Sequence, residues 1–212
     1  MKIHSISKGS IGRAALLLAA GLVLASSVAK ADTPDLYRQS YQAEARGDFR
    51  NAMARMSEIR ETAGASYFVS LRMGWLAYLA GDHTAAEAGY REAIAAKPGV
   101  VEPKIGLSLV LYMAQKWKAL ETVCKQVLAV DAKHPVVRAR MAAGYYGAGN
   151  YPDAAAIYRK LVDEYPGDLD YQTGYAWALQ HMGKREEAQK LFQAVLAVSP
   201  DNLNANQGAA AK

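Results

Sequence analysis

The chain has 212 residues, a formal net charge of +5 and a single cysteine. The excess charge lies at the N-terminus: residues 1–31 hold four of the 25 basic residues and no acidic residue, which leaves 21 basic against 20 acidic residues, or +1, for the rest. This near-neutral balance gives no support to a nucleic-acid-binding protein, and one cysteine excludes an internal disulfide framework. Packing must therefore hold the fold together.

The N-terminal segment, residues 1–31, has the composition of an export signal. Basic residues precede an apolar run that extends from Ala14 to Ala25, and Ala29-Lys30-Ala31 then forms a small-x-small cleavage pattern. This run is too short for a spanning helix, which needs about 20 residues. The sequence therefore predicts a signal peptide over 1–31, no membrane span after its cleavage, and an exported protein, with the periplasm favoured over secretion.

The remaining chain repeats itself with a period of about 34 residues, a length typical of repeat architectures. The segments GDFRNA, GDHTAA, GNYPDA and GKREEA end at Ala52, Ala86, Ala154 and Ala188, and QKWKAL, ending at Leu120, is the missing member of the series. The pattern predicts one domain over 32–202 that contains five units, followed by a short tail or partial capping helix over 203–212. The units are 33–66, 67–100, 101–134, 135–168 and 169–202.

Each unit is expected to form two antiparallel helices, because apolar residues recur at three- and four-residue steps on both sides of a central break. Glycine at the break suits a left-handed turn that ends the first helix, and an Asp or Asn after it suits an N-cap of the second. The glycines are Gly47, Gly81, Gly149 and Gly183, and the caps are Asp48, Asp82 and Asn150. In the third unit Gln115 replaces the glycine, so a less ideal turn is expected there.

Three columns of the repeat predict how the helices pack. Small residues occupy the eighth position (Ser40, Gly74, Ser108, Ala142, Ala176) and, except for Leu120, the twentieth (Ala52, Ala86, Ala154, Ala188). Larger residues occupy most of the twenty-fourth (Met56, Tyr90, Cys124, Tyr158, Phe192), and Pro98, Pro166 and Pro200 follow the second helix. Small residues let two helices approach closely, and added bulk there costs about 1–3 kcal/mol.

This periodic arrangement of small, aromatic and proline positions resembles the tetratricopeptide repeat family. The resemblance covers the chain after the signal peptide, although the aromatic residue usual at the fourth position is missing: Leu36, Ser70, Lys104, Arg138 and Gln172 stand there. It implies an all-α fold, an α-solenoid of five helix-turn-helix hairpins that form a right-handed superhelix. It also implies that the first helices line the concave face, with their second, fifth, ninth and twelfth residues pointing inward.

On this register the concave face carries a row of aromatic residues, in which Tyr78, Tyr112 and Tyr146 stand one period apart. Arginines at the sixth position (Arg38, Arg72, Arg140) are expected to flank the row. The predicted partner-binding residues are Tyr37, Tyr41, Phe68, Leu71, Arg72, Trp75, Tyr78, Leu109, Tyr112, Arg140, Tyr146 and Trp177. Two alternatives stay open: the rings can be core between repeats, and the arginines can pair with the protein's own acids.

No motif for catalysis or for a cofactor occurs in the sequence. It lacks a glycine-rich phosphate loop, HExxH, a nucleophile elbow and a CxxCH haem site. His83, His134 and His181 lie far apart without ligand spacing, and Cys124 falls in a core column, where a free cysteine behaves as a small hydrophobe. The sequence therefore predicts no enzyme, no cofactor and no metal site.

These observations favour a non-catalytic scaffold in the cell envelope that binds a segment of another protein along residues 37–177, with self-association as one form of partner. An apolar, charge-rimmed concave face is where a partner is expected. The alternative is a component of a polysaccharide export or envelope assembly system, in which tyrosine and tryptophan rings stack on sugars. The tail from Leu203 begins a sixth unit without completing it, so the fifth unit is expected to fray or to be covered by another molecule.

Overall fold

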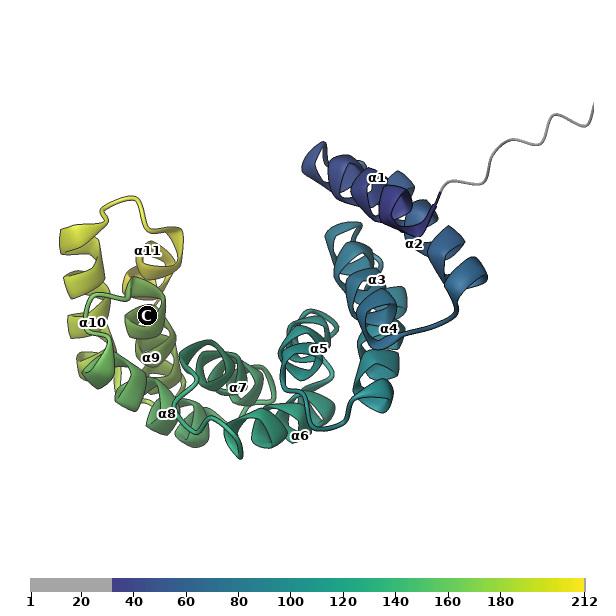
Figure 1. The fold of residues 1–212 in the computed structure, drawn as a ribbon. Helices are drawn as coiled ribbons and strands as arrows, with labels where there is room; N and C mark the ends of the chain where they lie inside the picture. The colour runs from purple at the N-terminus through teal and green to yellow at the C-terminus, as the bar shows by residue number, and fades with distance from the viewer. Residues whose placement is uncertain (1–31, 212) are drawn as a thin grey trace, which may run out of the picture. The chain divides into compact units, whose positions relative to one another are not determined.

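A computed structural model describes residues 32–211, so the predicted signal peptide lies outside the described residues. Within this range the chain forms eleven helices and no strand (Figure 1). The hairpins are α1 (Thr33–Ala45) with α2 (Phe49–Ala63), α3 (Tyr67–Leu79) with α4 (His83–Ala96), α5 (Glu102–Met113) with α6 (Trp117–Leu128), α7 (Pro135–Gly147) with α8 (Tyr151–Glu164), and α9 (Leu169–His181) with α10 (Arg185–Val198). A short helix, α11 (Leu203–Ala210), follows. The predicted all-α solenoid of five hairpins is confirmed.

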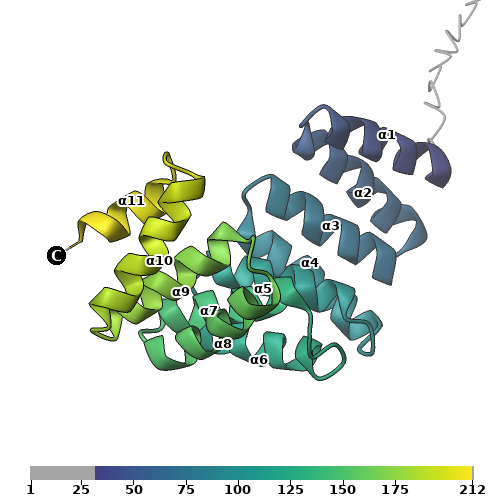
Figure 2. The same ribbon diagram turned by 90° about the vertical axis from the view of Figure 1, so that its left-hand side faces the viewer.

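The helices of residues 32–211 form two rows. Each helix packs against the next one in the chain, and the first helices also contact one another in the pairs α3/α5, α5/α7 and α7/α9. In Figures 1 and 2 the first helices line one side of the array and the second helices line the other. No helix of this part of the chain is both long and apolar enough to cross a membrane.

The turns inside the hairpins follow the sequence pattern. The four predicted glycines have φ between 73° and 79°, and Gln115, at 55°, is the non-glycine residue with positive φ in the described range. A left-handed conformation is costly for a residue with a side chain, so the third hairpin has the least favourable turn, as expected. Asp48, Asp82 and Asn150 accept a hydrogen bond from the backbone three residues on and cap the second helices.

The predicted core columns are buried. The residues of the eighth and twentieth columns, Gly74 included, are inaccessible or nearly so. A close approach of two backbones lies between α3 and α4, where a Cβ added to Gly89 would lie 2.7 Å from the backbone nitrogen of Gly74. In the first hairpin, the Ser40 hydroxyl donates to the carbonyl oxygen of Ala52 at 3.0 Å. Small residues therefore allow contact between backbones.

The fourth position, where the family's aromatic residue is absent, connects neighbouring repeats by hydrogen bonds. Lys104 Nζ donates to the carbonyl oxygen of Pro98, Gln172 Nε2 to that of Pro166, and Asn206 Nδ2 to that of Pro200, at 2.6, 2.6 and 2.9 Å. These are the three prolines that end second helices. Polar donors at the fourth position thus satisfy the carbonyls of the prolines that follow the second helices.

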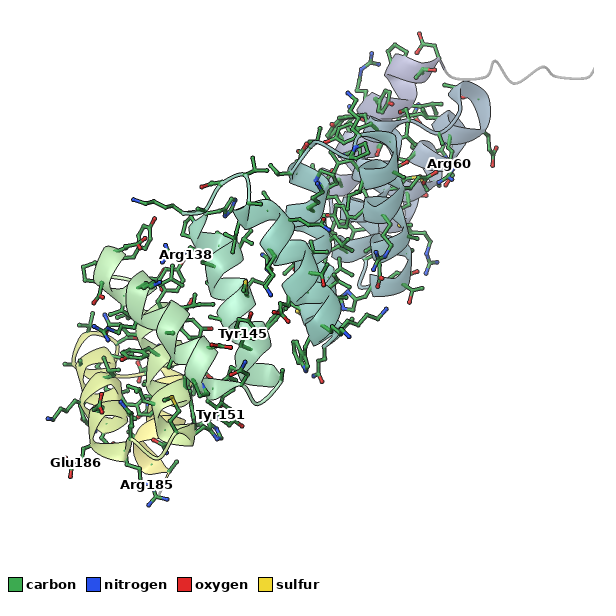
Figure 3. The ribbon with its side chains drawn as sticks, turned by 90° about the horizontal axis from the view of Figure 1, so that it is seen from below. Arg60, Arg138, Tyr145, Tyr151, Arg185 and Glu186 are labelled. Carbon is green, nitrogen blue, oxygen red and sulfur yellow. The ribbon has the colours of Figure 1, made fainter. Side chains whose placement is uncertain are left out.

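Two arginines form two-bonded pairs with glutamates, one pair within a hairpin and one between the first two repeats. Arg138, at the fourth position of the fourth unit, is 8% exposed and forms two hydrogen bonds to Glu164 of α8 in the same hairpin, at 2.6 and 3.0 Å. Arg60 of α2, labelled in Figure 3, similarly donates twice to Glu92 of α4. Two-bonded arginine–carboxylate pairs fix geometry better than single contacts, so these two pairs help set the register of the helices that they join.

Candidate functional site

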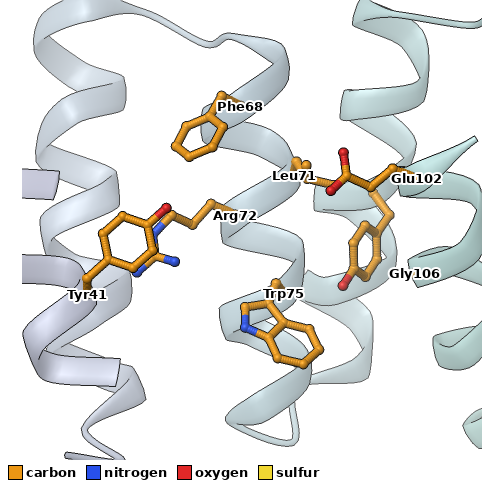
Figure 4. A pocket seen from close by; sticks show the side chains of 8 residues that line it. Tyr41, Phe68, Leu71, Arg72, Trp75, Glu102 and Gly106 are labelled. Carbon is orange, nitrogen blue, oxygen red and sulfur yellow. The ribbon is translucent and has the colours of Figure 1, made fainter. Parts of the chain in front are cut away.

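Two hollows lie along the side formed by the first helices. The first, of about 280 Å³, is lined by Tyr41, Phe68, Leu71, Arg72, Trp75, Tyr90, Glu102 and Gly106 (Figure 4). The second, of about 490 Å³, is lined by Tyr112, Ala143, Tyr146, Tyr158, Asp170, Thr173, Gly174, Trp177, Asn204 and Gln207. The structure therefore brings eight of the predicted binding residues to two separate hollows. Tyr37, Tyr78, Leu109 and Arg140 line neither.

The first hollow has the most exposed rings of the predicted set. Tyr41, Phe68 and Trp75 are 49%, 44% and 40% exposed. Phe68 packs edge-on against Tyr37 with 5.5 Å between ring centroids, and the Trp75 indole nitrogen donates to Glu44 at 2.7 Å. Isolated exposed rings are common on protein surfaces, but here three of them are gathered at one hollow and two are held by polar or aromatic neighbours.

Arg72 is buried at the junction of α1 and α3. It is 6% exposed, forms an ion pair with Glu44 at 2.9 Å, and donates to the Ser40 hydroxyl at 3.0 Å. Its guanidinium carbon also lies 3.5 Å from the centroid of the Tyr41 ring, and both side chains are labelled in Figure 4. A cation this close to a ring face is attracted to it. Arg72 therefore pairs with the protein's own acid and orients Tyr41, the alternative that the sequence left open.

The other two sixth-position arginines differ from Arg72 and from each other. Arg38 is exposed and pairs with Asp35 one turn away. Arg140, on α7, is half-buried, and its Nη1 donates to the carbonyl oxygen of Ile105 at 3.0 Å and to the Ser108 hydroxyl at 2.7 Å. Burial lowers the pKa of Arg140, and it forms no ion pair with a carboxylate in the part of the chain described. Arg140 is thus a cation bonded only to neutral oxygens.

The sixth position follows a rule that involves the preceding repeat. Where the twenty-fourth residue of the preceding repeat is aromatic, the sixth residue of the next repeat is glycine. The aromatic ring then fills the space that a side chain at the sixth position would occupy. A Cβ on Gly174, for example, would lie 2.6 Å from Tyr158 Cζ. Where the twenty-fourth residue is Met56 or Cys124, the sixth is arginine. The ring junctions are Tyr90 with Gly106, Tyr158 with Gly174, and Phe192 with Gly208.

The tyrosine ladder packs within its own hairpins. Each ladder ring contacts the ring that begins the second helix of its unit: Tyr78 with His83, Tyr112 with Trp117 and Tyr146 with Tyr151, at centroid distances of 6.3, 6.0 and 5.4 Å. All three ladder rings are half-buried. They contribute to the packing of the hairpins and retain accessible surface on the first-helix side.

The second hollow combines rings with polar side chains. Trp177 and Tyr146 both contact His181, which also stacks on Tyr151 at 4.5 Å between centroids. Asp170 and Thr173 line the hollow from α9, and Asn204 and Gln207 line it from α11. The tail predicted to be a partial cap is thus a wall of this hollow.

Sequence reasoning missed the polar residues of both hollows. Glu102 and Asp170 occupy the inward second position of their units, and Thr173 occupies the inward fifth. Their repeat positions indicate that all three face inward, whereas the predicted binding residues are mainly apolar and aromatic. Tyr90 was placed only in the core, where it is 4% exposed, although it also lines the first hollow.

The described residues show no metal-binding arrangement. No group of three or more His, Cys, Asp and Glu side chains between residues 32 and 211 is placed to hold a metal ion. Cys124 is fully buried, and burial raises the pKa of its thiol to about 11. His134 Nδ1 accepts from the backbone of Val137 at the start of α7, so this histidine has a local capping role.

Comparison with known proteins agrees with the repeat pattern. The sequence profile of the tetratricopeptide repeat matches residues 25–199, which confirms the predicted family resemblance. No curated protein sequence matches the chain.

Solved structures with the same fold share little sequence with this chain. MamA from Desulfovibrio magneticus (residues 41 to its end) has a TM-score of 0.75 at 18% identity, covering 82% of this chain and 99% of that one. A tetratricopeptide repeat protein from Parabacteroides merdae has a TM-score of 0.75 at 15% identity, covering 84% and 70%. YrrB, described as having an unusual peptide-binding site, has a TM-score of 0.71 at 14% identity, covering 83% and 91%. These likenesses establish the fold alone.

Proposed function

Since the chain belongs to the tetratricopeptide repeat family, we propose that it is a non-catalytic scaffold that binds a segment of another protein along the side formed by its first helices. The observation that carries this proposal is the group of exposed rings at the first hollow. Tyr41, Phe68 and Trp75 come from two repeats and converge on one hollow. Aromatic residues are enriched among those that contribute most to protein–protein binding.

These rings are held in place before any partner arrives. Glu44 accepts the indole N–H of Trp75 and also pairs with Arg72, whose guanidinium lies over Tyr41. A side chain that is already ordered loses less conformational entropy when it is buried in a complex. The Glu44–Arg72 pair therefore supports binding by orienting Tyr41 and Trp75. A peptide-binding site on the solved repeat protein YrrB is consistent with this use of the fold.

The place of action proposed for the protein is the cell envelope, because residues 1–31 have the pattern of an export signal. On this proposal the partner is a protein of the periplasm or of an envelope complex, or a second copy of this chain. The absence of catalytic motifs from the sequence supports the non-catalytic role.

A second candidate function rests on the second hollow. There Trp177 and Tyr146 stand beside Asp170, Asn204 and Gln207. Rings that stack on sugars, together with amide and carboxylate groups that accept or donate hydrogen bonds, form a surface suited to a polysaccharide. The polysaccharide-export or envelope-assembly role is therefore retained as the alternative.

Capture from envelope extract tests the scaffold proposal. The protein, carrying a C-terminal affinity tag, is compared with a Phe68→Ala, Trp75→Ala variant and with a control in which two exposed residues outside the two hollows, Val130 and Tyr165, are replaced by Ala. Circular dichroism checks that helicity is equal. We expect the first variant to capture at least ten-fold less of a protein that the wild type and the control both capture.

Equal capture of the same protein by all three forms would contradict binding at the first hollow. The polysaccharide alternative is tested separately by electrophoresis in gels that contain an acidic or a neutral polysaccharide. If the polysaccharide slows the migration of the wild type but not that of a Trp177→Ala variant, the result would favour that alternative over the scaffold.

A further inference from the structure

Arg140 stands between the two hollows. Its ionisable neighbours include Tyr90, which lines the first hollow, and Tyr112, which lines the second. Its Nη1 is bonded to α5, which supplies residues to both. A ligand that extended from one hollow to the other would therefore pass this guanidinium.

The positive charge of Arg140 is not neutralised by the described part of the chain. Its ionisable neighbours are Cys124, Tyr78, Tyr112 and Tyr90. Burial raises the pKa of Cys124 to about 11 and that of Tyr90 to about 12, so these two groups are uncharged at neutral pH. Arginine keeps its proton in proteins, and a partly buried charge without a counter-ion is unfavourable. Arg72, by contrast, has Glu44 beside it.

Part of the guanidinium is free to bond. Arg140 donates both of its hydrogen bonds to the described residues from Nη1. Its Nε and Nη2 have no acceptor among the described residues, yet neither is among the atoms that are both fully buried and unpartnered. Both nitrogens therefore keep some solvent-accessible surface. A carboxylate can accept from two guanidinium nitrogens at once, which is the strongest form of this contact.

The hollows on either side carry the opposite charge. Glu102 lines the first hollow, where it accepts a hydrogen bond from the Tyr67 hydroxyl at 2.8 Å, and Asp170 lines the second. The first-helix side therefore presents an acid, then an unpaired cation, then an acid. A ligand with one negative charge at its centre matches this order, whereas evenly spaced negative charges meet Glu102 and Asp170 with repulsion.

We propose that Arg140 binds a single carboxylate of a protein segment, at the point where that segment passes from the first hollow to the second, and that the flanking ligand residues are apolar or basic. This inference rests on the proposed function and deepens it, because it names the chemistry of the partner. The charge order favours a peptide over an acidic polysaccharide, whose negative charges recur along the chain.

Selection from a random dodecapeptide library displayed on phage tests the inference. The purified wild-type protein is the target, and each selected peptide is then synthesised and measured by fluorescence anisotropy. We expect selected peptides to share one Asp or Glu with apolar residues on both sides. Each should bind Arg140→Gln at least ten-fold more weakly than wild type, and replacing its acid by the amide should cause the same loss. The two changes combined should weaken binding no further than either alone.

Arg38→Gln is the matched control, because Arg38 has the same repeat position but is exposed and pairs with Asp35; its affinities should equal those of the wild type. Thermal unfolding is recorded for every variant. If Arg140→Gln unfolds, Arg140→Lys, which keeps the charge, replaces it. Arg140→Lys should also bind the peptides more weakly, because lysine cannot form the two-bonded contact.

Peptides that lack a shared acid, or that bind Arg140→Gln as tightly as wild type, would overturn this inference and leave the scaffold proposal standing. A wild-type protein that selects no peptide would instead contradict the scaffold proposal. Stronger retardation of the wild type than of Arg140→Gln by alginate would assign Arg140 to an acidic polysaccharide and also overturn the inference.

Discussion

The sixth residue of a first helix and the twenty-fourth residue of the repeat before it share one space. Tyr158 uses that space because Gly174 has no side chain, and Arg140 uses it beside the small Cys124. Protein interiors are packed to nearly constant density, so a larger residue at one position requires a smaller one at the other. This coupling places two arginines between repeats, and it leaves one of them, Arg140, without a counter-ion in the described chain.

The thiol of Cys124 should be unreactive in the folded protein near neutral pH. Only the thiolate reacts, and with a pKa of about 11 the thiolate fraction at pH 8 is about 0.1%, against about a quarter for an ordinary cysteine. We expect labelling by iodoacetamide at pH 8 to be at least 100-fold slower in native protein than in protein unfolded by guanidinium, and to accelerate as pH rises toward 11. Equal rates in the two states would show that the thiol is accessible and its pKa ordinary.

At the scale of helices, one kind of contact joins neighbouring repeats and another joins the two helices of a hairpin. Polar side chains at the fourth position bond the carbonyls of prolines that end second helices, as Gln172 does with Pro166. Within hairpins, small residues bring backbones together, as at Gly74 and Gly89. Both contacts depend on residue size and on hydrogen-bonding capacity, so both are sensitive to single substitutions.

The α3–α4 contact should not tolerate a methyl group. Although alanine favours a helix over glycine by about 1 kcal/mol, a Cβ on Gly89 would meet the backbone of α3 and force the helices apart. We expect Gly89→Ala to lower the free energy of unfolding by about 1–3 kcal/mol. Gly99→Ala is the control, because no atom lies within 4 Å of the added Cβ, and its effect should stay within about 0.5 kcal/mol. Urea unfolding followed by circular dichroism measures both, and equal stability would contradict close backbone packing.

Across the whole array, stability depends on contacts between neighbouring repeats, so the last repeat depends on α11. Gly208 lies against the Phe192 ring, and Ala205 is fully buried, which shows that this short helix covers the end of the core. The cover is incomplete, since Val198 and Leu203 are 74% and 77% exposed. The sequence-based expectation of a fraying fifth unit therefore stays a prediction.

Removal of residues 203–212 should loosen the fifth unit before the others. Without α11 the Phe192 ring loses its cover, and a large buried ring exposed in this way costs about 2–3 kcal/mol. Hydrogen–deuterium exchange measured by mass spectrometry should show faster exchange in residues 190–200 than in residues 107–127 of the full chain, and a further increase after truncation. Protection at residues 190–200 equal to that in residues 107–127, before and after truncation, would refute both fraying and the capping role.

The sequence by itself determined the period, the helical hairpins, their caps and the buried columns. These features repeat in register and depend on local conformational preferences, so five copies of one pattern reinforce each other. Gly47 and Asp48, for example, perform their turn and cap roles within one hairpin. Only the tertiary structure decided that Arg72 is buried with Glu44, that Arg140 lacks such a partner, and that the first-helix side divides into two hollows. Each of these three features depends on which side chains of neighbouring repeats contact one another. The residue type at a single repeat position does not specify these contacts between repeats.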